Sequence, residues 1–313
     1  MIDFRYHVVS IVAVFIALAV GIVLGSGPLK DNISGFLEDR TKALAAEKLD
    51  LQQQVTGLEG DLADAEDYAQ LVKSSVIDDV LFGTSVAMVM LPGATSDDRQ
   101  AVEATLVQAG AVVTEEVQIT QDWTDPDQAA ILARVNDGLD RSSQETDPYG
   151  SAADLIARAL VTQQARAVGQ SSPTGISILA AYEEAGFLRV ADLEAVTWAA
   201  TSVVVAPDPA DMDGTPPADQ VVTLLPLPVA LSERGRAALV VGPEASAGAD
   251  GVVTAVRGSD LGETVSTVDS IETTAGLTVV ALALDEQKNQ GVGHYGTGEG
   301  AQAVGPDLAA PGG

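Results

Sequence analysis

The chain has 313 residues, of which 45 are acidic and 16 are basic, and its formal net charge is −29 at pH 7. Nucleic-acid binding needs basic patches that neutralise phosphates, so this charge balance argues against a nucleic-acid partner. The chain contains no cysteine, which excludes disulfides, thiolate metal sites and cysteine nucleophiles. Its length allows one large or two modest domains in addition to an anchor.

The first element that we expect is a membrane helix. Residues 6–29 include no Lys, Arg, Asp or Glu, and a helix of this length would reach about 36 Å, enough to cross a hydrocarbon core of about 30 Å. We therefore assign residues 1–30 to an uncleaved signal anchor, which places the soluble body on the extracytoplasmic side. A cleaved signal peptide is the alternative, with a possible site at residues 17–19, but the apolar run continues beyond that site.

Small residues recur every four positions within this stretch, so they share one face of the helix. Small side chains let two membrane helices approach closely, and the pattern predicts a helix-packing face between copies of the chain. An ordinary membrane-helix composition is the alternative. The face consists of Ala13, Ala17, Gly21 and Gly25.

A heptad pattern of apolar residues follows, with mostly charged and amide side chains between them. This pattern predicts a coiled-coil stalk over residues 31–80 and, together with the small-residue face, a homo-oligomer. The alternative is a helix that folds back on its own body. The predicted seam contains Leu37, Leu44, Leu51, Val55, Leu58 and Leu62.

The remainder alternates apolar, β-branched runs with helical patterns. This alternation predicts an α/β domain over residues 81–290, a mostly parallel sandwich with helices on both faces of the sheet. The expected strands are 84–91, 111–120, 201–206 and 237–241, with 252–256 and 277–284 as further candidates. Residues 291–313 are rich in Gly, Ala and Pro, and we expect a flexible tail.

Motifs for catalysis are missing from the sequence. It contains no GxxxxGK[ST] or GxSxG pattern, and Gly110, Gly169 and Gly242 stand singly, without a GxGxxG turn. One of its two histidines, His7, adjoins the membrane helix, so we expect no enzymatic activity. His294 lies among glycines and near Glu299, and imidazole, carboxylate and backbone amides there form a weak candidate Cu(II) site. A solvated tail or a docking turn is the alternative.

Two other groups of possible ligands favour simpler interpretations. Asp208, Asp211 and Asp213 crowd one loop without the spacing of a calcium loop, so a solvated turn is preferred. Met88 and Met90 alternate on one side of an expected strand, which favours core packing over copper binding.

Two segments resemble a known family. The start, RYHVVSIVAVFIALAVGIVLGSGPL, and residues 266–301, STVDSIETTAGLTVVALALDEQKNQGVGHYGTGEGA, are similar to the actinobacterial copper transporter family, and the likeness extends over nearly the whole chain. The resemblance implies a membrane-anchored envelope protein of copper homeostasis or efflux, described in its family as pore-forming across the outer, mycolate membrane. Copper is therefore a possible ligand.

The residues themselves agree with an envelope location and not with a pore. A transmembrane barrel needs many segments of about ten residues that alternate apolar and polar side chains, whereas this body has buried-type strands between helices. The alternative function is a structural or interaction protein of the cell envelope without direct metal transport.

Overall fold

The computed structural model describes residues 4–26, 28–140, 147–212 and 217–307, and the side chains of residues 4, 26–38 and 217 lie outside this description. The chain divides into two compact units, residues 1–65 and residues 66–313.

The first unit is helical. Helix α1 spans Phe4–Ser26, and within the described residues it contains the one stretch long and apolar enough to cross a membrane, Arg5–Gly25. The predicted apolar helix is therefore confirmed. No heavy atom lies within 4 Å of a Cβ built on Gly21 or Gly25, so the predicted small-residue face is open in the single chain.

Helix α2 spans Pro28–Ile77 without a break. The described residues of the predicted seam are each more than half exposed, with exposed fractions of 53–67%. They are Leu44, Leu51, Val55, Leu58 and Leu62. Leu37 lies within the helix, but its side chain is outside the described part of the chain.

The second unit is built on a sheet of seven described strands in the order β3-β2-β1-β4-β5-β6-β7. Neighbouring strands are parallel except for β2 and β3, which are antiparallel, so the predicted mostly parallel α/β sheet is confirmed. The strands are β1 (Ser85–Met90), β2 (Val112–Ile119), β3 (Leu188–Val190), β4 (Thr201–Val205), β5 (Ala237–Val241), β6 (Ser266–Val268) and β7 (His294–Tyr295).

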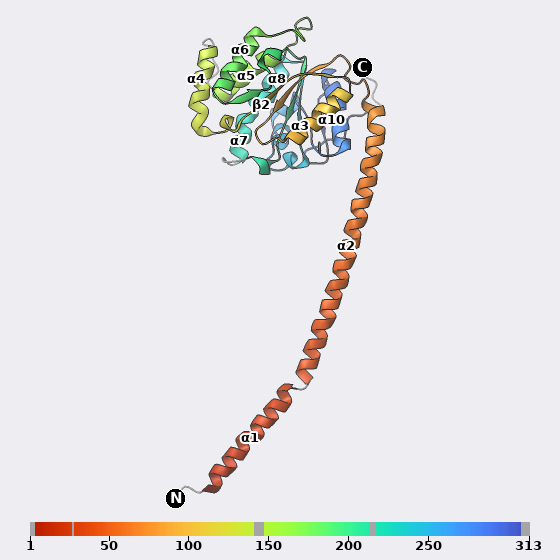
Figure 1. The fold of residues 1–313 in the computed structure, drawn as a ribbon, viewed down its shortest axis with the longest axis vertical. Coiled ribbons are helices and arrows are strands. Elements are labelled where there is room, and N and C mark those ends of the chain that lie inside the picture. Colours follow the sequence, from red (N-terminus) through yellow and green to blue (C-terminus); the bar gives the residue numbers. More distant parts are fainter. Residues whose placement is uncertain (1–3, 27, 141–146, 213–216, 308–313) are drawn as a thin grey trace. The chain divides into compact units, whose positions relative to one another are not determined.

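Helices cover both faces of the sheet (Figure 1). Successive β1 residues alternate between the two cores: Ala87 and Val89 join the core beneath α4 to α9, and Val86 and Met88 join the core beneath α3, α10 and the end of α2. The two-residue period of a strand produces this division. The helices are α3 (Ser96–Gln108), α4 (Ala129–Leu139), α5 (Pro148–Leu160), α6 (Pro173–Glu184), α7 (Pro217–Leu224), α8 (Pro226–Arg234), α9 (Val252–Arg257) and α10 (Thr274–Lys288).

Two strand predictions are wrong. Residues 252–256 and 277–284 are helical and belong to α9 and α10. A short apolar run does not by itself distinguish a strand from a buried helix. The N-cap of α10 decides the second case, because the Thr273 side chain accepts a hydrogen bond from the Gly276 amide.

The predicted flexible tail also differs from the structure. His294 and Tyr295 form β7, which pairs in parallel with Thr267 and Val268 of β6. Tyr295 also bridges to Ala303. The tail residues up to 303 thus close one edge of the sheet, and residues 308–313 lie outside the described part of the chain.

The last turns of α2 belong to the second unit and pack on its body. The Glu66 carboxylate accepts a hydrogen bond from the Thr274 amide at 2.7 Å, so it caps the N-terminus of α10. Lys73 is 6% exposed, and its ammonium group donates to the Thr105 hydroxyl of α3 at 2.8 Å. Residues 66–77 of α2 therefore pack on the body of their own chain.

Lys73 gives a test of this packing. Burial lowers the pKa of its ammonium group, and the Glu66 carboxylate offsets part of that effect. The folded chain therefore holds this proton less tightly than the unfolded chain, so stability should rise with pH from the folded pKa toward the ordinary value of 10.5.

We expect Lys73→Met to flatten the rise in unfolding free energy as the pH approaches 10.5, measured by urea denaturation. The matched variant Lys42→Met removes an exposed lysine from the same helix and should leave the slope unchanged. Identical slopes in wild type and Lys73→Met would contradict the buried placement.

Candidate functional site at the edge between β6 and β7

The usual ligand position of an open α/β sheet is closed here. Such sheets bind ligands where the strand order reverses, which in this chain is between β1 and β4. Gly93 follows β1 with φ of +88°, and a Cβ there would lie 2.8 Å from the Asp211 carbonyl oxygen, so the loop after β4 covers the turn. Asp97 and Asp98 in the first turn of α3 further disfavour a phosphate.

A buried ion pair lies at the end of β6 instead. Arg257 of α9 and Asp269 contact at 2.9 Å, and their side chains are 3% and 0% exposed. Arg257 also donates to the carbonyl oxygens of Tyr295 at 2.7 Å and Glu299 at 2.8 Å. One guanidinium therefore binds the C-terminal segment at two backbone positions.

The Asp269 carboxylate binds the same segment through its amides. It accepts hydrogen bonds from the backbone of Thr297 at 2.7 Å and Gly298 at 3.1 Å, and a third from the Ser270 hydroxyl at 2.7 Å. Gly296 has φ of +128°, and a Cβ there would overlap the Asp269 carboxylate. The glycines of this segment are therefore needed for close approach to the ion pair.

The electrostatics of the pair favour ionised Asp269. Burial alone would raise the pKa of this carboxyl, but hydrogen bonds from Ser270, Thr297 and Arg257 together outweigh burial and lower the pKa. The carboxylate is thus held charged and fully hydrogen-bonded, as a buried charge requires.

His294 joins the network through its ring. It is 7% exposed, with Nε2 at 3.1 Å from the Gly262 carbonyl oxygen and Nδ1 at 3.0 Å from the Thr267 hydroxyl. A carbonyl only accepts, so Nε2 carries the proton and Nδ1 accepts from Thr267, whose oxygen in turn accepts from Arg257 Nε at 2.8 Å. Burial, and then the charge of Arg257, lower the pKa of the ring, although the bond to Gly262 opposes them.

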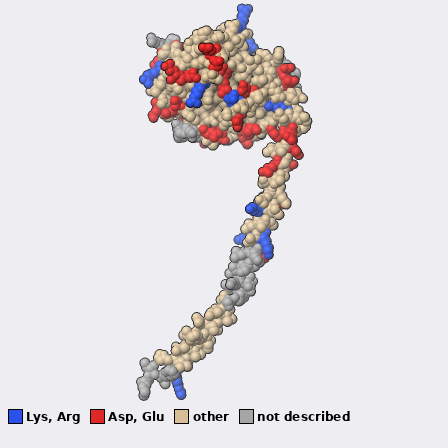
Figure 2. Space-filling view, viewed as in Figure 1, with Lys and Arg blue, Asp and Glu red and all other residues tan. Residues whose placement is uncertain are grey.

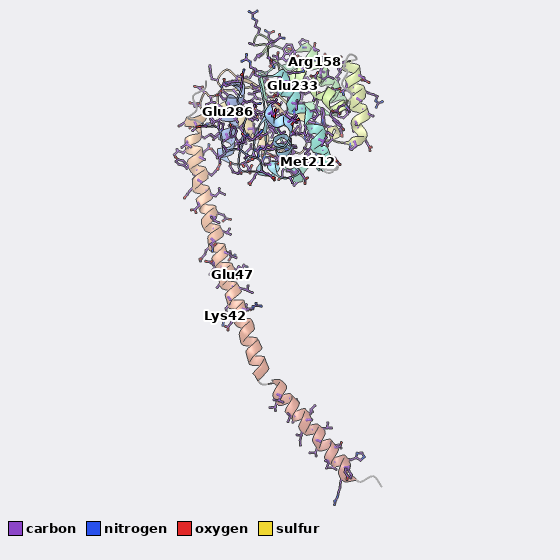
Figure 3. The ribbon with its side chains drawn as sticks, turned by 180° about the vertical axis from the view of Figure 1, so that it is seen from behind. Lys42, Glu47, Arg158, Met212, Glu233 and Glu286 are labelled. Atoms are coloured by element: carbon purple, nitrogen blue, oxygen red, sulfur yellow. The ribbon has the colours of Figure 1, made fainter. Side chains whose placement is uncertain are left out.

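Tyr295 fixes the segment on its other side. Its hydroxyl donates a short hydrogen bond to Glu286 of α10 (labelled in Figure 3). Burial and this carboxylate both raise the pKa of the phenol. The segment thus contacts α9, β6 and α10, which are the three elements around the edge of the sheet.

The structure does not bring the other predicted ligands together. Met88 and Met90 are buried in the core, as the sequence favours. Asp208 accepts from the amide of Ala210 in its own loop, and Asp213 lies outside the described residues. Among the residues that the structure describes, no three His, Asp or Glu side chains are grouped so that they could hold a metal ion.

Sequence reasoning singled out His294 and missed its partners. Thr267 and Asp269 lie at the start of the second family-like segment and His294 lies near its end. The parallel pairing of β6 with β7 brings those two ends together across α10. The missed signal was therefore residues 266–301 as a unit, which form two short strands with a helix between them. Arg257 lies outside this segment, and no local pattern in the sequence pointed to it.

Comparison with known proteins places this geometry in a family. A family model described as "Copper transport outer membrane protein, MctB" matches residues 1–306. The chain belongs to the MctB family. It is 34% identical over 315 residues to a protein named copper transporter MctB from Mycobacterium tuberculosis (strain ATCC 25618 / H37Rv), which covers 97% of this chain and 99% of the relative. The protein of the same name from Mycobacterium leprae (strain TN) is 30% identical over 318 residues, with the same shares covered.

Membership of the MctB family confirms the resemblance read from the two end segments. Both the apolar helix and the edge between β6 and β7 lie within the matched residues. Copper transport is therefore the function of the family. In this member, a buried ion pair holds the C-terminal segment to the described body.

The ion pair gives a second prediction. We expect Asp269→Asn to lower the unfolding free energy by about 3–5 kcal/mol, because Arg257 would remain buried without a counter-charge. The control is Asp154→Asn, since Asp154 pairs with Arg234 at side-chain exposures of 48% and 37%, and such a pair contributes about 0.2–1 kcal/mol. Urea denaturation measures the loss of unfolding free energy in both variants. Equal losses would contradict the buried placement of the Arg257–Asp269 pair.

Proposed function

We propose that this chain is a membrane-anchored, non-enzymatic envelope protein that acts in copper homeostasis or efflux, with its body on the extracytoplasmic side. The observation that carries the proposal is the family match over residues 1–306, which includes the apolar helix Arg5–Gly25. That helix supports anchoring by a single pass.

We further propose that the chain assists copper export and does not line a copper pore by itself. A channel wall needs polar groups or backbone carbonyls along its length, and residues 6–29 contain no charged side chain. The body presents mainly acidic charge on its visible face (Figure 2), which attracts cations without forming a specific site.

Self-association through the first unit is part of the proposal. The seam residues Leu44, Leu51 and Val55 line a groove on α2 together with Glu47 and Lys48, and their exposure in the single chain supports burial against a second copy. Lys42 and Glu47 are labelled on this helix in Figure 3. Because each copy would be anchored in the same membrane, the paired stalks would be parallel.

The absence of cysteine from the sequence makes this association testable by cross-linking. A single Leu51→Cys substitution should give a diamide-induced dimer on a denaturing gel, because equivalent seam residues of parallel helices come within disulfide range. Leu49→Cys is the matched control, since Leu49 is similarly exposed but lies about 200° around the helix. Equal cross-linking of the two variants would overturn the predicted seam.

The copper role is tested in cells that lack this chain. Cell-associated copper after copper challenge should rise in the deletion strain and return to normal with wild type. Leu51→Asp should fail to restore it because a charge in the seam blocks association, whereas the off-seam variant Leu49→Asp should restore it. Unchanged copper in the deletion strain would contradict the proposed role.

The second candidate function is a structural or interaction protein of the envelope. It is favoured by one observation, that the described residues contain no metal-binding cluster. In that case the deletion strain would be as sensitive to detergent as to copper, and detergent sensitivity measured beside copper content separates the two functions.

A further inference from the structure

The seam of α2 has the residue types of a two-stranded coiled coil. Leu44, Leu51 and Leu58 recur every seven residues and take position d of the heptad, and Val55 and Leu62 take position a. Leucine at d with a β-branched residue at a favours two parallel strands. All five side chains are more than half exposed in the single chain, so this seam is uncovered.

Between Leu44 and Leu62, one charged residue lies in the seam. Lys48 precedes Val55 by seven residues and therefore occupies position a, and it lines the groove that the seam residues form on α2. Its own helix offers no acidic neighbour, because the residues three and four positions away are uncharged: Leu44, Ala45, Leu51 and Gln52. Lys48 therefore needs a counter-charge from another helix once the seam is covered.

A second copy supplies that charge when two helices pair in parallel and in register. Each a side chain then packs beside the g residue that precedes the facing a position, and this g residue is Glu47. Glu47 lines the same groove as Lys48 and is labelled on α2 in Figure 3. The lysine stem can lie on the apolar seam while its ammonium group reaches the carboxylate of the other copy. Because the pairing is reciprocal, one dimer contains two such contacts.

Other arrangements of the stalk leave the lysine without a counter-charge. If one helix slips by a heptad, one Lys48 lies beside Gln54 of the other helix, and the second Lys48 lies beside Arg40. The first contact has no opposite charge and the second is repulsive. A third helix would enclose Lys48 more completely and would remove three ammonium groups from water, which is costly.

We propose that Lys48 and Glu47 restrict the stalk to two parallel copies in register, with each Lys48 paired to Glu47 of the second copy. The proposal rests on the proposed self-association of the first unit and adds the number of copies and their register. A single charged residue at position a lowers the stability of a coiled coil but specifies its pairing.

The test uses the full chain in detergent micelles. Sedimentation equilibrium measures the number of copies and their dissociation constant, and wild type should contain two copies. Lys48→Glu should raise the dissociation constant about tenfold, because two attractive contacts become repulsive. Glu47→Lys combined with Lys48→Glu restores both contacts at the net charge of wild type, so this swap should recover most of the loss.

Lys42→Glu is the matched control. It makes the same change in charge at an exposed residue of the same helix, but position 42 is at b of the heptad, off the seam. The dissociation constant should therefore change by less than about threefold, through charge contacts within the helix alone.

Register is measured by cross-linking two chains of different size, one with Leu44→Cys and the other with Leu51→Cys. In an in-register pair these positions are a heptad apart, about 10 Å along the helix, which is beyond disulfide range. Diamide should therefore link chains of equal size and leave the mixed pair unlinked.

Four results would contradict the proposal. These are a wild-type complex of three or more copies, a mixed cross-link as strong as the equal one, a Lys48→Glu chain that associates as tightly as Lys42→Glu, and a swap no tighter than Lys48→Glu. Each of them leaves self-association standing. A monomeric wild type would instead remove self-association and this proposal together, so the two failures are distinguishable.

Discussion

A carboxylate and a guanidinium, both removed from water, hold the end of this chain to the edge of its sheet. Asp269 binds two amides of the C-terminal segment and Arg257 binds two of its carbonyl oxygens. A buried ion pair is weak evidence for added stability, because desolvation offsets the attraction between the charges. Its clearer effect is to specify how the C-terminal segment lies on the sheet edge. A Cβ at position 296 would overlap the Asp269 carboxylate, and the backbone must follow a course that brings its amides to Asp269 and its carbonyl oxygens to Arg257.

The sequence predicted the centre of the sheet well and its edge poorly. The inner strands β1, β4 and β5 are continuous apolar runs between helical patterns, which is the pattern of a parallel strand buried on both faces. The short strands β6 and β7 have three and two residues, which are too few to show the two-residue alternation of side chains that marks a strand. Helix α10 has an apolar run that fits strand or helix equally, and only its cap at Thr273 decides between them.

For the candidate site, the sequence singled out one member but not its surroundings. His294 was recognisable as an imidazole among glycines. Arg257 and Asp269 were not, because their meaning depends on burial and on a crossover through α10 that sequence spacing does not reveal. The seam of α2 is the opposite case, since its pattern is plain in the sequence but the second copy that we propose packs against it is not part of a single chain.

The protonation state of His294 reports directly on whether the C-terminal segment is held at the edge of the sheet. Nitrogen-15 NMR of the imidazole in the full chain at neutral pH should show one fixed neutral tautomer, with the proton on Nε2 and Nδ1 as acceptor. One equivalent of Cu(II) should leave that signal unbroadened. A ring that exchanges between tautomers, or one that Cu(II) broadens at once, would mean that His294 is open to solvent and that the segment is not held as described.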